Sequence, residues 1–288
     1  MKKFTFKLWA VLLLLLVSLQ TFATDNEYGL KDNIQDGVIL HCFDWTYAQI
    51  KEELPNIAAA GFSAVQTSPA HPREPVGAAW YMLYQPYDYK VGENGLGTKE
   101  GLTELCTEAH QYGVKIIVDV VANHTNGSLS YVASFWQDQS LYHDYQGGID
   151  YSNRWQVTHG RIGMWDLKTE DSRVQEKIKE YVAELKSCGV DGIRWDAAKH
   201  IGLPSEGDTF WQNVPDQTMY NYGEILDGTG GDDTVSEKVE VVSQTTGVQL
   251  HPVAGESSAK AMIYNLQGQR VDANYHGVVV CNGRKYVQ

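Results

Sequence analysis

Apolar positions along the chain follow two alternating patterns. Short β-like runs at 38–43, 64–68, 115–121, 192–196 and 219–224 have the length of strands. Between them, apolar residues recur at helical spacing, and these stretches end near glycines. Strands that alternate with amphipathic helices predict parallel βαβ units.

The predicted helices have clear boundaries. Thr46 and Gln49 form a capping box before the first helix, Thr98 caps the second, and Gly113 ends it. Apolar residues at helical spacing over 174–188 predict the third helix.

Two segments interrupt this pattern. The polar and aromatic stretch 125–169 is too long for an ordinary βα loop, so it predicts a small inserted subdomain. After the fifth run, the glycine- and aspartate-rich stretch 227–233 predicts a linker. Beyond it, 261–271 and 277–287 predict β-hairpins, the second with an Asn282-Gly283 turn.

The N-terminus predicts a secretory signal peptide over residues 1–23. Three lysines within the first seven residues precede an apolar run over 8–19, and Thr21 and Ala23 supply the small residues of a cleavage site. The run is too short for a membrane span. We therefore expect a protein that is secreted or at the cell surface after cleavage near Ala23, with no membrane span.

The composition limits the classes of partner that this protein can bind. A net charge of -13 argues against nucleic acids and anionic membranes, which require a basic face. A neutral polymer such as a glycan fits this charge and the content of Trp and Tyr. The four cysteines are widely scattered, which favours buried free thiols over a disulfide framework.

Polar side chains gather where the predicted strands finish. Because the carboxyl ends of parallel barrel strands share one face, we expect these side chains to lie together. Two carboxylates on neighbouring strand ends suit the cleavage of a glycosidic bond. The side chains are Asp119, Asn123, His124, Arg194, Asp196 and Glu224.

The same segments resemble the α-amylase family of glycoside hydrolases. Residues 119–124 (Asp-Val-Val-Ala-Asn-His) resemble its first signature, 192–200 (Gly-Ile-Arg-Trp-Asp-Ala-Ala-Lys-His) its second, and Gly223-Glu224 its third. The stretch 80–86 is similar to the aromatic wall of the family, and 164–167 to the motif that closes its inserted subdomain.

The resemblance covers about residues 38–226 and implies an α/β fold. This fold is a partial TIM (β/α) barrel over 24–233, with the small subdomain inserted after strand 3. A short C-terminal β tail over 234–288 resembles secretion or sorting tails of exported bacterial hydrolases, chiefly through 264–271. We expect strands six to eight to be deleted and the tail to be joined near Asp233.

The resemblance also implies a retaining, endo-acting hydrolase of α-1,4-glucans such as starch or glycogen. Asp196 would be the nucleophile, Arg194 would keep it ionised and oriented, and Glu224 would be the acid/base with a raised pKa. The residues that would contact substrate are Trp80, Tyr81, Tyr84, Gln85, His124, Lys199 and His200.

The family's structural Ca²⁺ is implied as well. A hard cation prefers oxygen ligands. The matching ligands are the side chains of Asn123 and Asp166, the backbone carbonyl of His200 and a carbonyl near Thr158.

One signature of the family has no match. It is a His-Asp pair whose aspartate assists the transition state, whereas His251-Pro252 and His276-Gly277 follow Glu224 here, and His143-Asp144 lies in another segment. We therefore predict impaired hydrolysis. The alternatives are an inactive or partner-dependent glucan-binding remnant, a transglycosylase of the same family, and a chain with no stable fold.

Simpler structural roles also remain open for the individual residues. Arg194 and Asp196 could form an ion pair at the barrel mouth, and Asp119 could cap a strand. Trp80 and Tyr84 could serve loop packing alone.

Overall fold

The computed structural model describes residues 26–74, 79–145 and 147–225, together with the backbone of four short strands between 263 and 287. The predicted signal peptide and the predicted linker lie outside the described residues. Among the helices described, none has the length and apolar character needed to cross a bilayer.

A five-stranded parallel sheet forms the centre of the molecule. Its strands stand in the order β1 (Ile39–Cys42), β2 (Ala64–Thr67), β3 (Lys115–Val121), β6 (Gly192–Asp196) and β7 (Tyr220–Gly223). Every neighbouring pair is parallel. All five predicted strands are confirmed, and the fold is the α/β fold of a partial TIM barrel.

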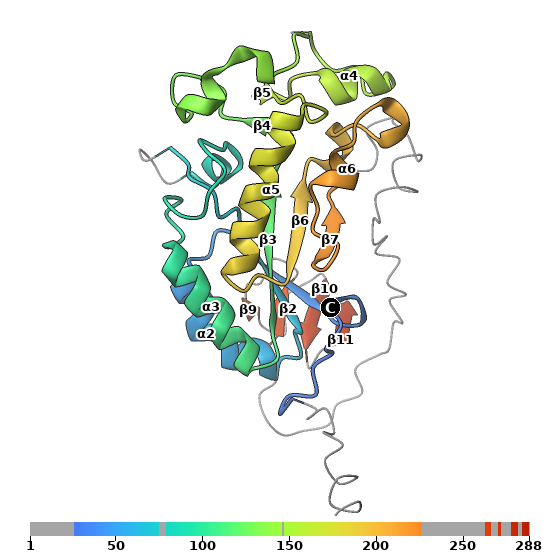
Figure 1. Cartoon of the computed structure of the whole chain (residues 1–288). Coiled ribbons are helices and arrows are strands. Elements are labelled where there is room, and N and C mark those ends of the chain that lie inside the picture. Colours follow the sequence, from blue (N-terminus) through green and yellow to red (C-terminus); the bar gives the residue numbers. More distant parts are fainter. Residues whose placement is uncertain are drawn as a thin grey trace, which may run out of the picture.

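The three longest of the described helices connect β1 to β2, β2 to β3 and β3 to β6. They are α2 (Tyr47–Ala59), α3 (Lys99–Gln111) and α5 (Ser172–Ser187), and Figure 1 shows α2 and α3 side by side along the sheet. The predicted capping box is present, since the Gln49 backbone N–H donates to Thr46 Oγ1 over 3.2 Å and the Thr46 N–H donates to Gln49 Oε1 over 2.9 Å.

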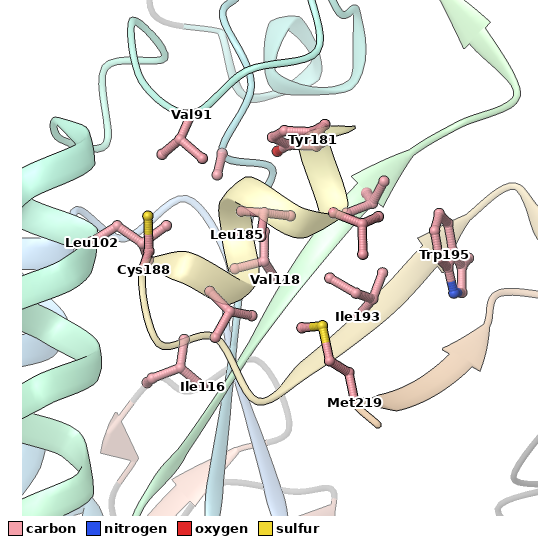
Figure 2. Packing of buried hydrophobic residues seen from close by; sticks show 14 of the residues in the cluster. Val91, Leu102, Ile116, Val118, Tyr181, Leu185, Cys188, Ile193, Trp195 and Met219 are labelled. Carbon is pink, nitrogen blue, oxygen red and sulfur yellow. The ribbon is translucent and has the colours of Figure 1, made fainter. Parts of the chain in front are cut away.

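The main core lies between the sheet and the apolar faces of α2, α3 and α5. The apolar face of α5 is fully buried, and Figure 2 shows its Leu185 directed at Val118 of β3 and near Ile193 of β6. Cys188 is buried in the same cluster, and both Cys42 and Cys106 are also buried free thiols. This agrees with the thiols predicted at these three positions.

The insertion after β3 lies over the carboxyl ends of the strands (Figure 1). It contains an antiparallel pair, β4 (His124–Thr125) and β5 (Trp165–Asp166), and the short helix α4 (Arg154–His159). It also contains the 3₁₀ turns η3 (Ser134–Gln137) and η4 (Gln139–Leu141). Buried aromatic side chains hold this insert together.

Further short helical turns were not predicted from the sequence. They contain too few residues to show a helical period. They are η1 (Ile34–Asp36), η2 (Trp80–Tyr84), η5 (Ala198–His200), η6 (Pro204–Glu206) and α6 (Phe210–Asn213).

The four C-terminal strands form a separate antiparallel sheet in the order β11-β10-β8-β9. They are β8 (Ile263–Asn265), β9 (Arg270–Val271), β10 (Val278–Cys281) and β11 (Arg284–Val287). Both predicted hairpins are confirmed. Cys281 pairs with Arg284, so only Asn282-Gly283 separates the two strands of the second hairpin.

Candidate active site

The polar residues at the strand ends lie together, as the sequence predicts. In the register between β3 and β6, Asp119 is opposite Arg194. Asp196 ends β6, and Glu224 directly follows β7. The backbone N–H of Glu224 donates to the Trp195 carbonyl over 2.8 Å, which continues the ladder to the position of the acid.

One guanidinium joins three carboxylates at this edge. Arg194 Nη1 lies 2.7 Å from Asp119 Oδ2 and 2.9 Å from Asp196 Oδ1, and Nη2 lies 2.6 Å from Glu224 Oε1. When all four groups are ionised, three negative charges face one positive charge. The site therefore concentrates negative charge in partly buried surroundings, which favours retention of a proton.

Burial is the largest influence on the charge of Asp196. Burial, together with the neighbouring Asp119 and Glu224, raises the pKa of this carboxyl to about 8 against the opposing effect of Arg194. Burial also raises the pKa of Asp119. This differs from the expectation that the adjacent Arg194 keeps Asp196 ionised, because Arg194 is shared among three carboxylates.

The residue after the predicted nucleophile has a left-handed backbone. Ala197 has φ 49° and ψ 33°, a conformation that costs on the order of 1–3 kcal/mol in a non-glycine residue. Its N–H donates to Glu224 Oε2 over 3.2 Å. The turn therefore positions Glu224 through its second oxygen, and alanine gives no signal of such a turn in the sequence.

A pocket of about 270 Å³ opens beside the carboxylates. It contains four of the seven predicted substrate-contacting residues. It also contains side chains from the insert that the sequence analysis did not assign, Tyr151, Ile162 and Met164. Its lining residues are Tyr84, His124, Tyr151, Ile162, Met164, Asp196, Ala197, Lys199, His200 and Glu224.

Only weak sequence patterns point to the pocket residues that were not predicted, Tyr151, Ile162 and Met164. Met164 begins the 164–167 motif and could have been assigned from it. Tyr151 lies in an aperiodic stretch, and its ring lies 5.5 Å from the Lys199 ammonium and 5.9 Å from the His200 ring. Only the folded chain brings these three residues together.

Tyr84 and His124 are fixed by hydrogen bonds at the pocket wall. The Tyr84 hydroxyl donates to Asp119 Oδ2 over 3.0 Å, and His124 Nε2–H donates to the Tyr84 carbonyl over 3.0 Å. Burial lowers the pKa of His124 to about 4, so this ring is neutral at physiological pH. Both side chains are therefore held in one orientation at the pocket wall.

The remaining predicted substrate contacts lie outside the pocket lining. Trp80 and Tyr81 are 53% and 48% exposed, and the Trp80 ring meets the Tyr84 ring edge-on with centroids 6.3 Å apart. Gln85 Oε1 accepts a hydrogen bond from Asn126 Nδ2 over 3.1 Å. Trp80 and Tyr81 thus extend an aromatic surface away from Tyr84.

Two of the predicted calcium ligands, Asn123 and Asp166, contact each other, and the other two, Thr158 and His200, lie on segments that are joined by a hydrogen bond. Asn123 Nδ2 donates to Asp166 Oδ1 over 3.0 Å, and both side chains are buried. Thr158 lies in the last turn of α4, where His200 Nδ1–H donates to the neighbouring Val157 carbonyl over 2.8 Å. Burial raises the pKa of Asp166 to about 6.

Comparison with known proteins agrees with this arrangement. The family described as "Alpha amylase, catalytic domain" matches residues 44–277. The α-amylase of Clostridium acetobutylicum is 40% identical over 227 residues, which cover 72% of this chain and 30% of that protein. The α-amylase of Butyrivibrio fibrisolvens is 32% identical over 246 residues, which cover 71% of this chain and 25% of that protein.

The fold agrees as well. A complex of α-amylase I from Eisenia fetida with maltohexaose superposes with a TM-score of 0.61 at 24% identity, over 70% of this chain and 48% of that one. The chain thus spans about a third or less of the length of these curated relatives. With its family match, its parallel sheet and its carboxylates at the strand ends, the chain belongs to the α-amylase catalytic-domain family.

Proposed function

We propose that this chain is an endo-acting hydrolase of α-1,4-glucans that retains the anomeric configuration. The observation that carries the proposal is the single guanidinium of Arg194, which contacts Asp196 and Glu224 on neighbouring strand ends. A retaining glycosidase needs two carboxyl groups about 5–5.5 Å apart, one as nucleophile and one as acid/base. Two carboxylates that bind different nitrogens of one guanidinium suit such a separation.

The reaction would proceed in two displacements. Asp196 attacks the anomeric carbon while protonated Glu224 gives its proton to the departing glycosidic oxygen, so a covalent β-glycosyl ester forms at Asp196. Glu224, now ionised, takes a proton from water, and that water breaks the ester. Two inversions return the α configuration.

The proton that the buried site retains must change place for these steps. The pKa of about 8 keeps it on Asp196 at neutral pH, whereas the mechanism requires it on Glu224 when the glycosidic bond breaks. Arg194 contacts both carboxylates and Asp119, so it can stabilise the ionised partner as the proton moves. Asp119 and Tyr84 would keep Arg194 and the pocket wall in place.

A neutral sugar polymer fits the surface beside this pocket. Trp80 and Tyr81 present exposed aromatic faces next to Tyr84, and such faces stack on the apolar faces of glucose rings. The maltohexaose bound by the Eisenia fetida enzyme supports a glucan substrate by analogy of family.

The residues near the insert fit a structural Ca²⁺. Asp166 is a buried carboxylate beside the Asn123 amide, and together they offer the oxygen donors that a hard cation prefers. Asn123, Asp166 and the carbonyls of His200 and Thr158 would hold the ion. Bound calcium would fasten the insert to the barrel and take no chemical step.

We further propose that hydrolysis by this chain alone is slow. No His-Asp pair follows Glu224 in the sequence. A third carboxylate near the developing positive charge would therefore have to come from elsewhere.

Glucan binding without turnover is the second candidate. The exposed Trp80 and Tyr81 favour it, because stacking on sugars needs no transition-state geometry. Export by the predicted signal peptide would bring either activity to polymeric glucans outside the cell.

The test is release of reducing sugar from soluble starch by the purified protein, compared with Asp196→Asn. We expect slow release that the substitution abolishes, with products of α configuration in NMR spectra taken before mutarotation. Starch binding by both proteins without any release would select the binding function, and β products would contradict the retaining mechanism.

A further inference from the structure

A cluster of metal-ligating side chains lies in the insert, apart from the catalytic carboxylates. His143, His159 and Glu170 place possible ligand atoms within 4.8 Å of one another. They come from three segments: the stretch after η4, the last turn of α4, and the residue two positions before α5. These side chains line a second pocket of about 540 Å³, whose wall includes Tyr145, Trp155 and Lys168.

We propose that these three residues form a binding site for a divalent transition-metal ion, with Zn²⁺ as the best match. Two imidazoles and one carboxylate are a ligand set that Zn²⁺ accepts, and a fourth position would remain open to water. Imidazole nitrogen is a poor ligand for Ca²⁺, which prefers oxygen. This site is therefore chemically distinct from the calcium site that the family resemblance implies.

Hydrogen bonds at Nδ1 direct the Nε2 atoms of both histidines toward the cluster. His143 Nδ1 lies 2.6 Å from Asp166 Oδ2, and His159 Nδ1 lies 3.1 Å from the Trp155 carbonyl oxygen. Both oxygens are acceptors, so each Nδ1 carries a hydrogen, and each Nε2 can bind a metal when it is unprotonated. A carboxylate or carbonyl behind the ring is the usual way in which proteins orient a metal-binding histidine.

The contact between His143 and Glu170 is favourable when the ring carries a hydrogen on both nitrogens, and against the effect of burial the two carboxylates raise the pKa of His143 to about 9. His143 Nε2 lies 3.2 Å from Glu170 Oε1. If Nδ1 carries the only hydrogen of the ring, both facing atoms are acceptors, and they repel each other. A metal ion bound to both atoms would take the place of the second proton and remove this repulsion.

Packing holds the cluster in place. The His159 ring stacks on Trp155 with centroids 4.7 Å apart and faces the His143 ring at 4.3 Å. His143 is buried, and its backbone N–H donates to the Asp166 carbonyl over 3.0 Å. A metal here would join the three segments and stabilise the insert, which supplies Tyr151 and Met164 to the catalytic pocket.

The experiment is calorimetric titration of the full chain with Zn²⁺ in an excess of Ca²⁺, so that the predicted calcium site is saturated. We expect one Zn²⁺ per chain and a higher melting temperature with Zn²⁺. His159→Gln and Glu170→Gln should each weaken binding by roughly tenfold or more, at least the effect of losing an outer-shell partner. Matched controls are His110→Gln and Glu104→Gln, whose side chains pair with Asp191 and Lys51 instead.

Absorption of the Co²⁺-loaded protein gives an independent readout. Wild type and both controls should show visible bands of Co²⁺ with nitrogen ligands, and these bands should be lost in His159→Gln and Glu170→Gln. The melting temperatures of the metal-free variants check that they fold. Absence of Zn²⁺ binding, or binding that both ligand variants retain, would overturn the site and leave a protonated His143 between two carboxylates.

Discussion

Among the individual residues, the charged groups around Arg194 have the largest effect on the pKa values and the stability of the site. Burial raises the pKa of Asp196 to about 8, well above the value of roughly 3.9 expected in an unfolded chain. An acid with a raised pKa in the folded state contributes full stability below the unfolded pKa and loses it as the pH rises through the folded pKa. The raised pKa of Asp196 therefore costs stability at neutral and alkaline pH, where the same carboxyl is ionised in the unfolded chain.

We therefore expect Asp196→Asn to melt at a higher temperature than wild type, while losing activity. The gain should be near zero around pH 4 and largest at about pH 9, and even 1 kcal/mol corresponds to roughly 2–4 °C in a protein of this size. Thermal melts over this pH range measure it. Asp216→Asn is the opposite control, because Lys186 lowers the pKa of Asp216 to about 2 and the substitution should reduce stability at neutral pH.

A second prediction concerns the exposed aromatic residues. Trp80→Ala and Tyr81→Ala should each weaken maltooligosaccharide binding by about threefold to tenfold, since an aromatic contact contributes roughly 0.5–1.5 kcal/mol. Affinity titration of the inactive Asp196→Asn background measures this without turnover. Trp155→Ala is the matched control, because Trp155 is 54% exposed but lines the other pocket. Unchanged affinity in all three would exclude Trp80 and Tyr81 from the glucan site.

Among the elements, α2 gives the simplest test of how the sequence specifies structure. Thr46→Ala removes one side of the capping box and should cost about 1 kcal/mol of stability. Thr107→Ala is the control, because Thr107 is exposed within α3, where alanine is the better helix former. In melting curves, Thr46→Ala should clearly lower the melting temperature, whereas Thr107→Ala should change it little or raise it.

The elements also show why sequence reasoning succeeds in some places and fails in others. β3 is apolar at nearly every position, and α5 has one apolar face. In each case the local sequence alone shows which side chains are buried. The turn at Ala197 and the 3₁₀ turns η2 and η5 have no local sequence pattern of this kind. Their conformation follows from contacts between distant segments.

The residues of the candidate site also fall into two groups, those that a sequence pattern predicts and those that only the fold brings together. Asp196 and Glu224 follow from their places at strand ends and from the family motifs. Tyr151 and the cluster of His143, His159 and Glu170 depend on how the insert folds back on itself. The sequence assigned no role to His143-Asp144, because the partners of His143 are Asp166 and Glu170, more than twenty residues away.

At the level of the whole molecule, calcium should hold the insert over the barrel. In zinc-free buffer, Ca²⁺ should raise the melting temperature of the metal-free protein, because binding to the folded state alone stabilises it. Asp166→Asn should remove most of this response, whereas Asp150→Asn, an exposed acid of the insert, should keep it. A melting temperature that Ca²⁺ leaves unchanged in the wild type would contradict the predicted site.

The last prediction compares this chain with a full-length relative. We expect its turnover of starch to be at least 10²–10³ times lower than that of the Clostridium acetobutylicum α-amylase, since a lost charge partner of the transition state commonly costs several kcal/mol. The missing His-Asp pair is the physical reason, because Asp119 already binds Arg194 and Tyr84 and is fully buried. Asp119 therefore cannot move to take the place of the absent aspartate.

The comparison requires starch affinity and starch turnover on the same purified protein. Binding should be affected less than turnover, because Trp80, Tyr81 and Tyr84 need no transition-state geometry. Turnover within about tenfold of the relative would mean that another residue or a second chain supplies the third carboxylate. Dependence of the rate on protein concentration would then separate these two sources, since only a second chain makes the specific activity rise with concentration.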